Sequence, residues 1–458
     1  MEGEIHLTRK LGIWTAVFAV FASMIGSGIF GNSGYILATV KSPGITVFLW
    51  VFYGLVALAG ALSYAELSAM MPHAGGEYVY IRKVFGKLPS FLSGWVSFVV
   101  GFAAPAAASA FLAVDYLKDI FTLALPDSTL TVFLSTAMGQ KTIAISLILL
   151  FSLVHIVGVE KGSFVQNTLT VVKLGIIAVF IIAGFFALMN LKPIPVSDII
   201  SIENTEWKSV GLGMLLVLYA YSGWNGATYL AGEIKNPEKN VPRALFWGTL
   251  LTIFIYLIMN LIYFFSVPAS ELTGQGTPAF LAATRLFGKG VSIIFSVAFC
   301  IILLSSISAQ IMIGPRVYYA MARDKNFFSY AGKIHKRFHT PMISILLQSF
   351  LSIIYILSGT FYTVLIYMGF ALSIFPIVTM LSLMKIRYQN GSKMKTEHLY
   401  QTPMFPLLPV FFILVSIFLM VFSFIQNWQS CLTALGAVLI GIPMYYVWMM
   451  MSQKKAKK

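Results

Sequence analysis

Two short clusters of small and polar residues interrupt long apolar stretches of the chain. The first, GSGIFG, covers residues 26–31, and the second, YSGWNG, covers residues 221–226. Glycine costs a helix about 1 kcal/mol relative to alanine, so each cluster favours a break in a helix. A broken helix leaves backbone N–H groups unpaired at the start of one half and carbonyl groups unpaired at the end of the other. These groups bind charged ligands.

The stretches around these clusters are long and apolar enough to be membrane spans. The chain has 458 residues, 58% of them hydrophobic and only 10% charged, whereas a soluble domain has about 25% charged residues. A span takes about 20 apolar residues. We expect twelve spans, near residues 12–38, 44–70, 88–117, 141–158, 162–190, 208–232, 243–267, 288–322, 341–358, 360–385, 404–427 and 430–451.

The basic residues predict the orientation of these spans. If the N-terminus is cytoplasmic, 23 of the 31 lysines and arginines lie on the inner side and seven on the outer side. An excess of basic residues is typical of cytoplasmic loops. We therefore expect a multi-pass protein of the cell membrane with both termini in the cytoplasm. The net charge of +15 is then mainly a topology signal and does not indicate nucleic-acid binding.

An enzyme or a channel would need features that this sequence lacks. It has no HExxH motif, no pair of carboxylates within the spans and no His/Cys cluster, and Cys300 and Cys431 match no zinc spacing. We also find no filter loop or ring of charge. Residues 26–31 match the GxGxxG pattern of dinucleotide sites. Such a site also needs a preceding strand and an acidic residue about 20 positions later, but no Asp or Glu occurs between Glu4 and Glu66. We expect no catalytic residue, no metal site and no cofactor.

The two clusters occupy corresponding places in the two halves of the chain. The first and sixth spans enter the membrane from opposite sides, as an inverted repeat of five plus five spans requires. We predict an all-α integral membrane fold with twelve transmembrane helices, of which helices 1 and 6 are broken. Close helix packing is the alternative explanation for either cluster alone. The expected parts are a cytoplasmic N-terminus (1–11), two repeats (12–190 and 207–385), helices 11 and 12 (404–451) and a basic tail (452–458).

Five motifs in order resemble a known family. They are GSGIF in the first span, PHAGGEYVY after the second, GWN with AGEIKNPEKNVPRA at the sixth, GPRVYYAMARD closing the eighth, and GIPMYYVW in the twelfth. This set resembles the amino acid–polyamine–organocation (APC) superfamily, and within it the L-type amino acid transporter branch. The resemblance implies the LeuT-type fold, alternating access and a permease or antiporter of amino acids.

The half-helix ends indicate how such a ligand is held. Amides of Ser27 and Gly28 are placed to bind a carboxylate, and a side chain at Gly28 would crowd it. Carbonyls near Met24 and Ile25, with those of the sixth span, are placed to bind an ammonium group. An α-amino acid carries both charges side by side. The residues expected at the substrate site are Met24, Ile25, Gly26, Ser27, Gly28, Tyr219, Ser222 and Asn225.

The roles of two of these residues have alternatives. The resemblance implies that Tyr219 forms an aromatic lid over the substrate. The alternative is that it only packs against lipid or the core, as most tyrosines do. Asn225 either contacts the ligand or caps the unwound backbone. No Asp or Glu lies in the middle of a span expected to line the site, which favours neutral amino acids. A polyamine or cationic amino acid exchanger is the alternative, as is a substrate-sensing receptor on the same fold.

Lys173 is the only basic residue expected deep within a span. A lysine at the bilayer centre costs about 2.5–3.5 kcal/mol, so it should face the bundle interior rather than snorkel to the surface. The resemblance implies that a lysine here supplies the charge that sodium supplies between spans one, five and eight in sodium-coupled relatives. Its expected neighbours are Ser305, Ser306 and Ser308. We therefore expect sodium-independent exchange or proton-linked uptake, with Lys173 as the coupling residue.

The loops indicate the remaining partners. Glu233, after the sixth span, can pair with Arg316 or Arg323 to form an inner gate, whereas a solvated loop is the default alternative. The outer loop between spans three and four contains no cysteine, although eukaryotic L-type members link to a heavy subunit there. We expect the substrate and the lipid bilayer as partners, with no nucleic acid and no disulfide-linked heavy subunit.

Overall fold

The structure is a computed structural model that describes residues 9, 11–73, 75–191, 194–359, 361–390, 400–426 and 428–456. Side chains are described for these residues except 159–161, 163, 361–367, 390, 430 and 451–456. Most of the predicted N-terminal segment 1–11, and residues 457–458 of the predicted tail, therefore lie outside the described part of the chain.

All regular elements of the described residues are helices, apart from an isolated bridge between Leu11 and Ile234. The helices are α1 (Ile13–Met24), α2 (Ser27–Val40), α3 (Pro43–Met70), α4 (Glu77–Phe85), α5 (Lys87–Val96), the π-helical η1 (Ser97–Gly101), α6 (Ala103–Ala124), α7 (Thr129–Ser135), α8 (Ala137–Ile156), α9 (Val159–Asn190), α10 (Val196–Ile200), the 3-10 helix η2 (Trp207–Ser209), α11 (Val210–Tyr221), α12 (Gly226–Tyr229), α13 (Pro237–Ser266), α14 (Ala269–Leu272), α15 (Pro278–Arg323), the 3-10 helix η3 (Ser329–Gly332), α16 (Met342–Ser358), α17 (Phe361–Asn390), α18 (Leu407–Gln426) and α19 (Trp428–Ala456).

The predicted spans are present as helices. Ten helical segments of the described chain are long and apolar enough to cross a membrane. Two shorter apolar helices, Trp207–Tyr221 and Met342–Ser358, correspond to the sixth and ninth spans. The eighth span corresponds to the part of α15 (Pro278–Arg323) that follows a kink at Gly288, where the backbone leaves the helical conformation.

The two predicted breaks are present, and they are narrower than the clusters that indicated them. In the first span only Ile25 and Gly26 lie between α1 and α2. In the sixth span the chain leaves α11 after Tyr221 and resumes as α12, which is only four residues long. The expected inner half of the sixth span is therefore a single helical turn.

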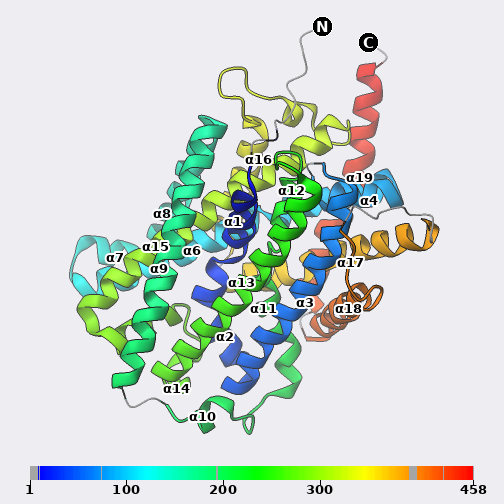
Figure 1. Cartoon of the computed structure of the whole chain (residues 1–458). Coiled ribbons are helices and arrows are strands. Elements are labelled where there is room, and N and C mark those ends of the chain that lie inside the picture. Colours follow the sequence, from blue (N-terminus) through cyan, green and yellow to red (C-terminus); the bar gives the residue numbers. More distant parts are fainter. Residues whose placement is uncertain are drawn as a thin grey trace.

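The broken helices lie at the centre of the bundle, so the other helices shield their free backbone groups. α2 packs against α11, while α1 packs against α12 and α13. Around them α3 packs on α13, and the alanine-rich α6 packs on α15. Apolar side chains of outer helices, such as Ile182 of α9 and Leu414 of α18, are exposed and suit contact with lipid. α1 begins and α19 ends at the same end of the bundle, opposite α10 and α14 (Figure 1).

Candidate functional site

The break in the first span places backbone amides at the middle of the bundle. Ile25 (φ −78°, ψ 109°) and Gly26 (φ −166°, ψ −138°) leave the helical conformation, and α2 starts at Ser27. The amides of Ser27 and Gly28 belong to the first turn of α2, so they have no acceptor within the helix. These are the amides that the sequence predicted for a carboxylate, and their binding role stays a prediction.

The structure gives a different reason for glycine at position 28 from the one that the sequence predicted. A Cβ atom at this position would lie 2.5 Å from both the Cα and the Cβ of Ala220 in α11. Only glycine therefore lets α2 approach α11 this closely. A larger residue would disturb the contact between the two broken helices, whether or not a carboxylate binds beside it.

The carbonyls at the end of α1 already accept hydrogen bonds from protein side chains. The hydroxyl of Tyr256 in α13 lies 2.6 Å from the Met24 oxygen and 2.8 Å from the Ala220 oxygen. The Ile25 oxygen accepts a bond from Lys173. The sequence assigned these two carbonyls to a ligand alone and did not predict Tyr256, which joins the two broken helices. A tyrosine among 21 in the chain carries no signal that would single it out.

Lys173 lies where the sequence expected it and does not snorkel. Its side chain is fully buried, and Nζ donates to the Ile25 oxygen at 2.6 Å and to Ser306 Oγ at 3.0 Å. Ser306 is thus the neighbour that was predicted correctly. Ser308 instead bonds to His155 (2.9 Å), and the Ser305 hydroxyl has no hydrogen-bond partner among the described residues.

Tyr219 links the two breaks from the side of the sixth span. Its ring is 4% exposed, and its hydroxyl forms a hydrogen bond with Ser27 Oγ at the start of α2. Ser109 of α6 donates a longer bond of 3.4 Å to the same Ser27 oxygen. Tyr219 therefore lies beside the amides proposed to hold a carboxylate. Whether it closes over a ligand stays a prediction.

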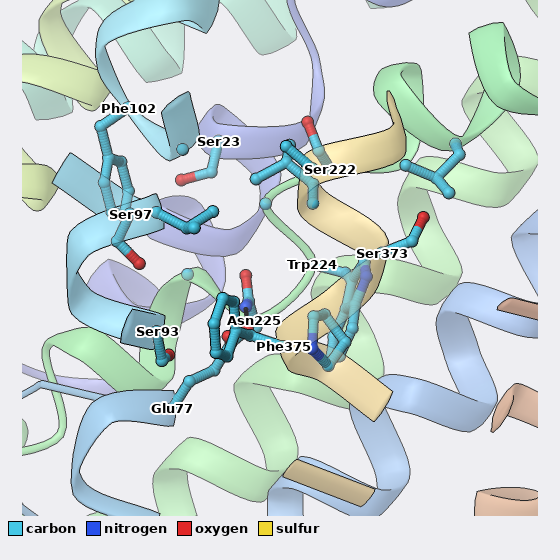
Figure 2. A pocket seen from close by; sticks show the side chains of 18 of the residues that line it. Ser23, Glu77, Ser93, Ser97, Phe102, Ser222, Trp224, Asn225, Ser373 and Phe375 are labelled. Atoms are coloured by element: carbon cyan, nitrogen blue, oxygen red, sulfur yellow. Dashed lines mark hydrogen bonds between the residues drawn. The ribbon is translucent and has the colours of Figure 1, made fainter. Parts of the chain in front are cut away.

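A cavity of about 90 Å³, lined by both apolar and polar side chains, adjoins the break in the sixth span (Figure 2). The unwound chain turns at Gly223, whose φ of +98° is a left-handed conformation that favours glycine. The π-helical η1 and α17 form other parts of the wall, and π-helical turns are frequent at functional sites. The lining residues with polar side chains include Ser23, Glu77, Ser93, Ser97, Ser222, Asn225, Gln310, Ser373 and Ser416.

Of the predicted site residues, only Ser222 and Asn225 line this cavity. Asn225 makes no capping bond to the backbone, and its Nδ2 donates to Glu77 Oε1 at 2.7 Å and to Tyr229 Oη at 3.1 Å. The sequence did not predict Glu77, because it begins α4 in the connection between two spans. Burial raises the pKa of this carboxyl to about 7. The sequence analysis considered only Asp and Glu residues in the middle of spans, and so it missed this carboxyl group at the cavity.

The predicted ion pair beyond the sixth span is present. Glu233 and Arg316 are both buried, and Arg316 Nε lies 3.5 Å from Glu233 Oε1. The Leu11 amide donates to the Glu233 backbone oxygen (2.9 Å), and the Lys235 amide donates to the Leu11 oxygen (2.8 Å). The alternative of a solvated loop is wrong, because these contacts hold the segment after α12 against α15 and the chain before α1.

A helical bundle of twelve spans, with two broken helices meeting beside a cavity, defines a secondary transporter. The model of the amino acid permease family matches residues 11–452, and the chain belongs to this family. The resemblance seen in the sequence is confirmed, and the protein is a multi-pass membrane transporter of amino acids rather than an enzyme.

The similarity to curated relatives extends over nearly the whole chain. The chain is 30% identical over 444 residues to the serine/threonine exchanger SteT of Bacillus subtilis (strain 168), covering 96% of this chain and 97% of SteT. It is 29% identical to the mouse b(0,+)-type amino acid transporter 1, covering 96% and 88% of the two chains. It is 26% identical to the human large neutral amino acids transporter small subunit 2, covering 97% and 81%.

Proposed function

We propose that the protein moves neutral amino acids across the cell membrane by alternating access, either by sodium-independent exchange or by proton-linked uptake. The observation that carries this proposal is the contact between the two breaks. The first turn of α2 lies beside Tyr219, and a small cavity adjoins the other break. The relatives named for serine/threonine and for large neutral amino acids support a neutral substrate.

In this proposal the two charged groups of the substrate bind to the unwound backbone. The amides of Ser27 and Gly28 hold the carboxylate, and the free lone pairs of carbonyls around both breaks hold the ammonium group. Tyr219 shields the bound molecule, while the cavity receives its side chain. The proposed binding residues are Met24, Ile25, Gly26, Ser27, Gly28, Tyr219, Ser222 and Asn225.

Sodium independence is proposed because Lys173 supplies a positive charge between spans one, five and eight. Its Nζ donates to the Ile25 carbonyl and to Ser306 Oγ, two oxygens of the kind that coordinate sodium. A cation bound there would meet like charge from a protonated amine. Lys173 is thus the proposed coupling residue.

The remaining proposals concern arrangement in the membrane. We place both termini in the cytoplasm, supported by the basic inner loops and by the start of α1 and the end of α19 at one end of the bundle. The Glu233–Arg316 pair then closes the inner side. The proposed repeats remain 12–190 and 207–385, followed by helices 11 and 12. Cys300 and Cys431 are both buried, which supports a transporter without a disulfide-linked heavy subunit.

Uptake into proteoliposomes tests this proposal directly. We expect purified protein to exchange labelled neutral amino acids against internal ones, with no loss when choline replaces sodium outside. Lysine and putrescine in the same assay test the cationic alternative. Strict dependence on sodium would overturn the coupling mechanism, and binding in a thermal-shift screen without any uptake would indicate a receptor.

Two conservative variants test the bond between the breaks. Tyr219→Phe and Ser27→Ala each remove the same hydrogen bond, which is worth about 1 kcal/mol. We expect each to lower the initial uptake rate by a few fold, and the double variant to be no worse than the stronger single one. Tyr219→Ala should lower it much further, because it also removes the ring. Equal uptake by wild type and Tyr219→Ala would reduce Tyr219 to a packing residue.

A further inference from the structure

One carboxylate, that of Glu77, lies on the wall of the cavity and has no cationic partner among the residues that the structure describes. Glu77 is 6% exposed and begins α4, where the helix dipole stabilises a negative charge. The ion pairs of the described chain do not include it. Its hydrogen bond from Asn225 Nδ2, at 2.7 Å from Oε1, comes from a neutral donor. Glu77 thus holds an acceptor at the cavity that no lysine or arginine of the described residues neutralises.

A second polar group beside this carboxylate also lacks a partner. Ser93 is 1% exposed, lines the same cavity, and its hydroxyl makes no hydrogen bond to the described residues. In Figure 2 Ser93, Glu77 and Asn225 gather at one end of the cavity, away from Ser23 and Phe102. Buried polar groups are normally hydrogen-bonded, so this end of the cavity is suited to a polar ligand group.

The size of the cavity restricts what that group can be. Its volume of about 90 Å³ suits a small ligand group. A carboxylate accepts a hydrogen bond from a hydroxyl, and a buried acceptor that loses such a donor is left unsatisfied. Sites built in this way reject analogues that lack the hydroxyl.

We propose that Glu77, held by Asn225, determines specificity by accepting a hydrogen bond from the hydroxyl of a small amino acid side chain. This inference rests on the proposed amino acid transport and names its side-chain class. Asn225 acts as the positioning residue, because it belongs to the unwound chain of the sixth span and its Nδ2 donates to Glu77 Oε1 at 2.7 Å. Any movement of that segment during transport then also moves the specificity determinant.

Isosteric competitors test this assignment in the full chain. Proteoliposomes loaded with alanine exchange labelled alanine, and the inhibition constants of serine, 2-aminobutyrate, threonine and valine are measured. Each pair differs by a hydroxyl in place of a methyl group. We expect wild type to prefer the hydroxyl member about 10-fold or more. Glu77→Gln should reduce this preference to about 3-fold or less, because a neutral amide is a weaker acceptor.

A matched control replaces a carboxylate away from the cavity. Asp115→Asn in α6 makes the same chemical change outside the lining and should leave the preference unaltered. A wild-type preference for the hydroxyl member near 1 would overturn the assignment without any variant. An unchanged preference in Glu77→Gln would also overturn it. In either case, continued exchange of alanine by the wild-type protein would show that the proposed transport function still holds. Wild-type protein that exchanges no amino acid would overturn both.

Discussion

Replacing Lys173 by methionine is expected to lower transport at least 10-fold while the protein still reaches the membrane. Methionine keeps most of the apolar volume but removes the donor that lies 2.6 Å from the Ile25 oxygen and 3.0 Å from Ser306 Oγ. A hydrogen bond from a charged group is worth about 1.5–3 kcal/mol, so losing two of them changes how the broken helix is held against α9 and α15. Initial uptake rates in proteoliposomes, normalised to the amount of monodisperse protein, measure the effect.

Companion variants separate the charge from the packing. Lys173→Ala should lose transport to the same extent and also unfold at a lower temperature, because it leaves a cavity. Ser306→Ala removes only one of the partners of Lys173, so its effect should be smaller. Full uptake by Lys173→Met would show that the amine has no part in the cycle, although the substrate assignment would stand.

The largest stability loss is expected at Arg387. Its guanidinium forms two bonds with Glu66, Nε to Oε1 at 2.5 Å and Nη2 to Oε2 at 3.0 Å, and the Thr402 amide donates to Oε2 at 2.8 Å. Glu66 is 1% exposed, so Arg387→Leu leaves a buried carboxylate without its counter-ion. Breaking such a pair costs about 3–5 kcal/mol. Thermal unfolding in detergent should show a large drop in the midpoint.

An exposed pair provides the control for this variant. Arg285 and Glu271 also form an ion pair, but their side chains are 52% and 45% exposed. Arg285→Leu should cost less than about 1 kcal/mol. The double variant Glu66→Met with Arg387→Leu should recover much of the loss, because no unpaired charge remains. Similar midpoints for Arg387→Leu and Arg285→Leu would contradict a structural role for the buried pair.

The spans and the breaks could be predicted because they depend on local properties of the chain. Length and hydropathy define a span, and the glycines of residues 26–31 and 221–226 weaken a helix wherever it packs. Lys173 could be found for a similar reason, since a lysine far from either end of a span must turn inward. The pairing of Glu233 with Arg316 could be predicted because Glu233 follows the sixth span and Arg316 lies near the end of the eighth, on the same side of the membrane.

Only the tertiary structure decided which groups meet at the breaks. Tyr256 reaches the Met24 oxygen across 232 positions of the chain, and Asn225 reaches Glu77 across 148. Neither contact leaves a local pattern, because such pairs depend on how α4 and α13 pack around the broken helices. Gly28 is a further example. The sequence indicated that this position needs glycine, but only the structure shows that the residue it must leave room for is Ala220 in another helix. Hydropathy and helix propensity act within a segment, whereas a hydrogen bond or a steric contact needs the positions of two segments at once.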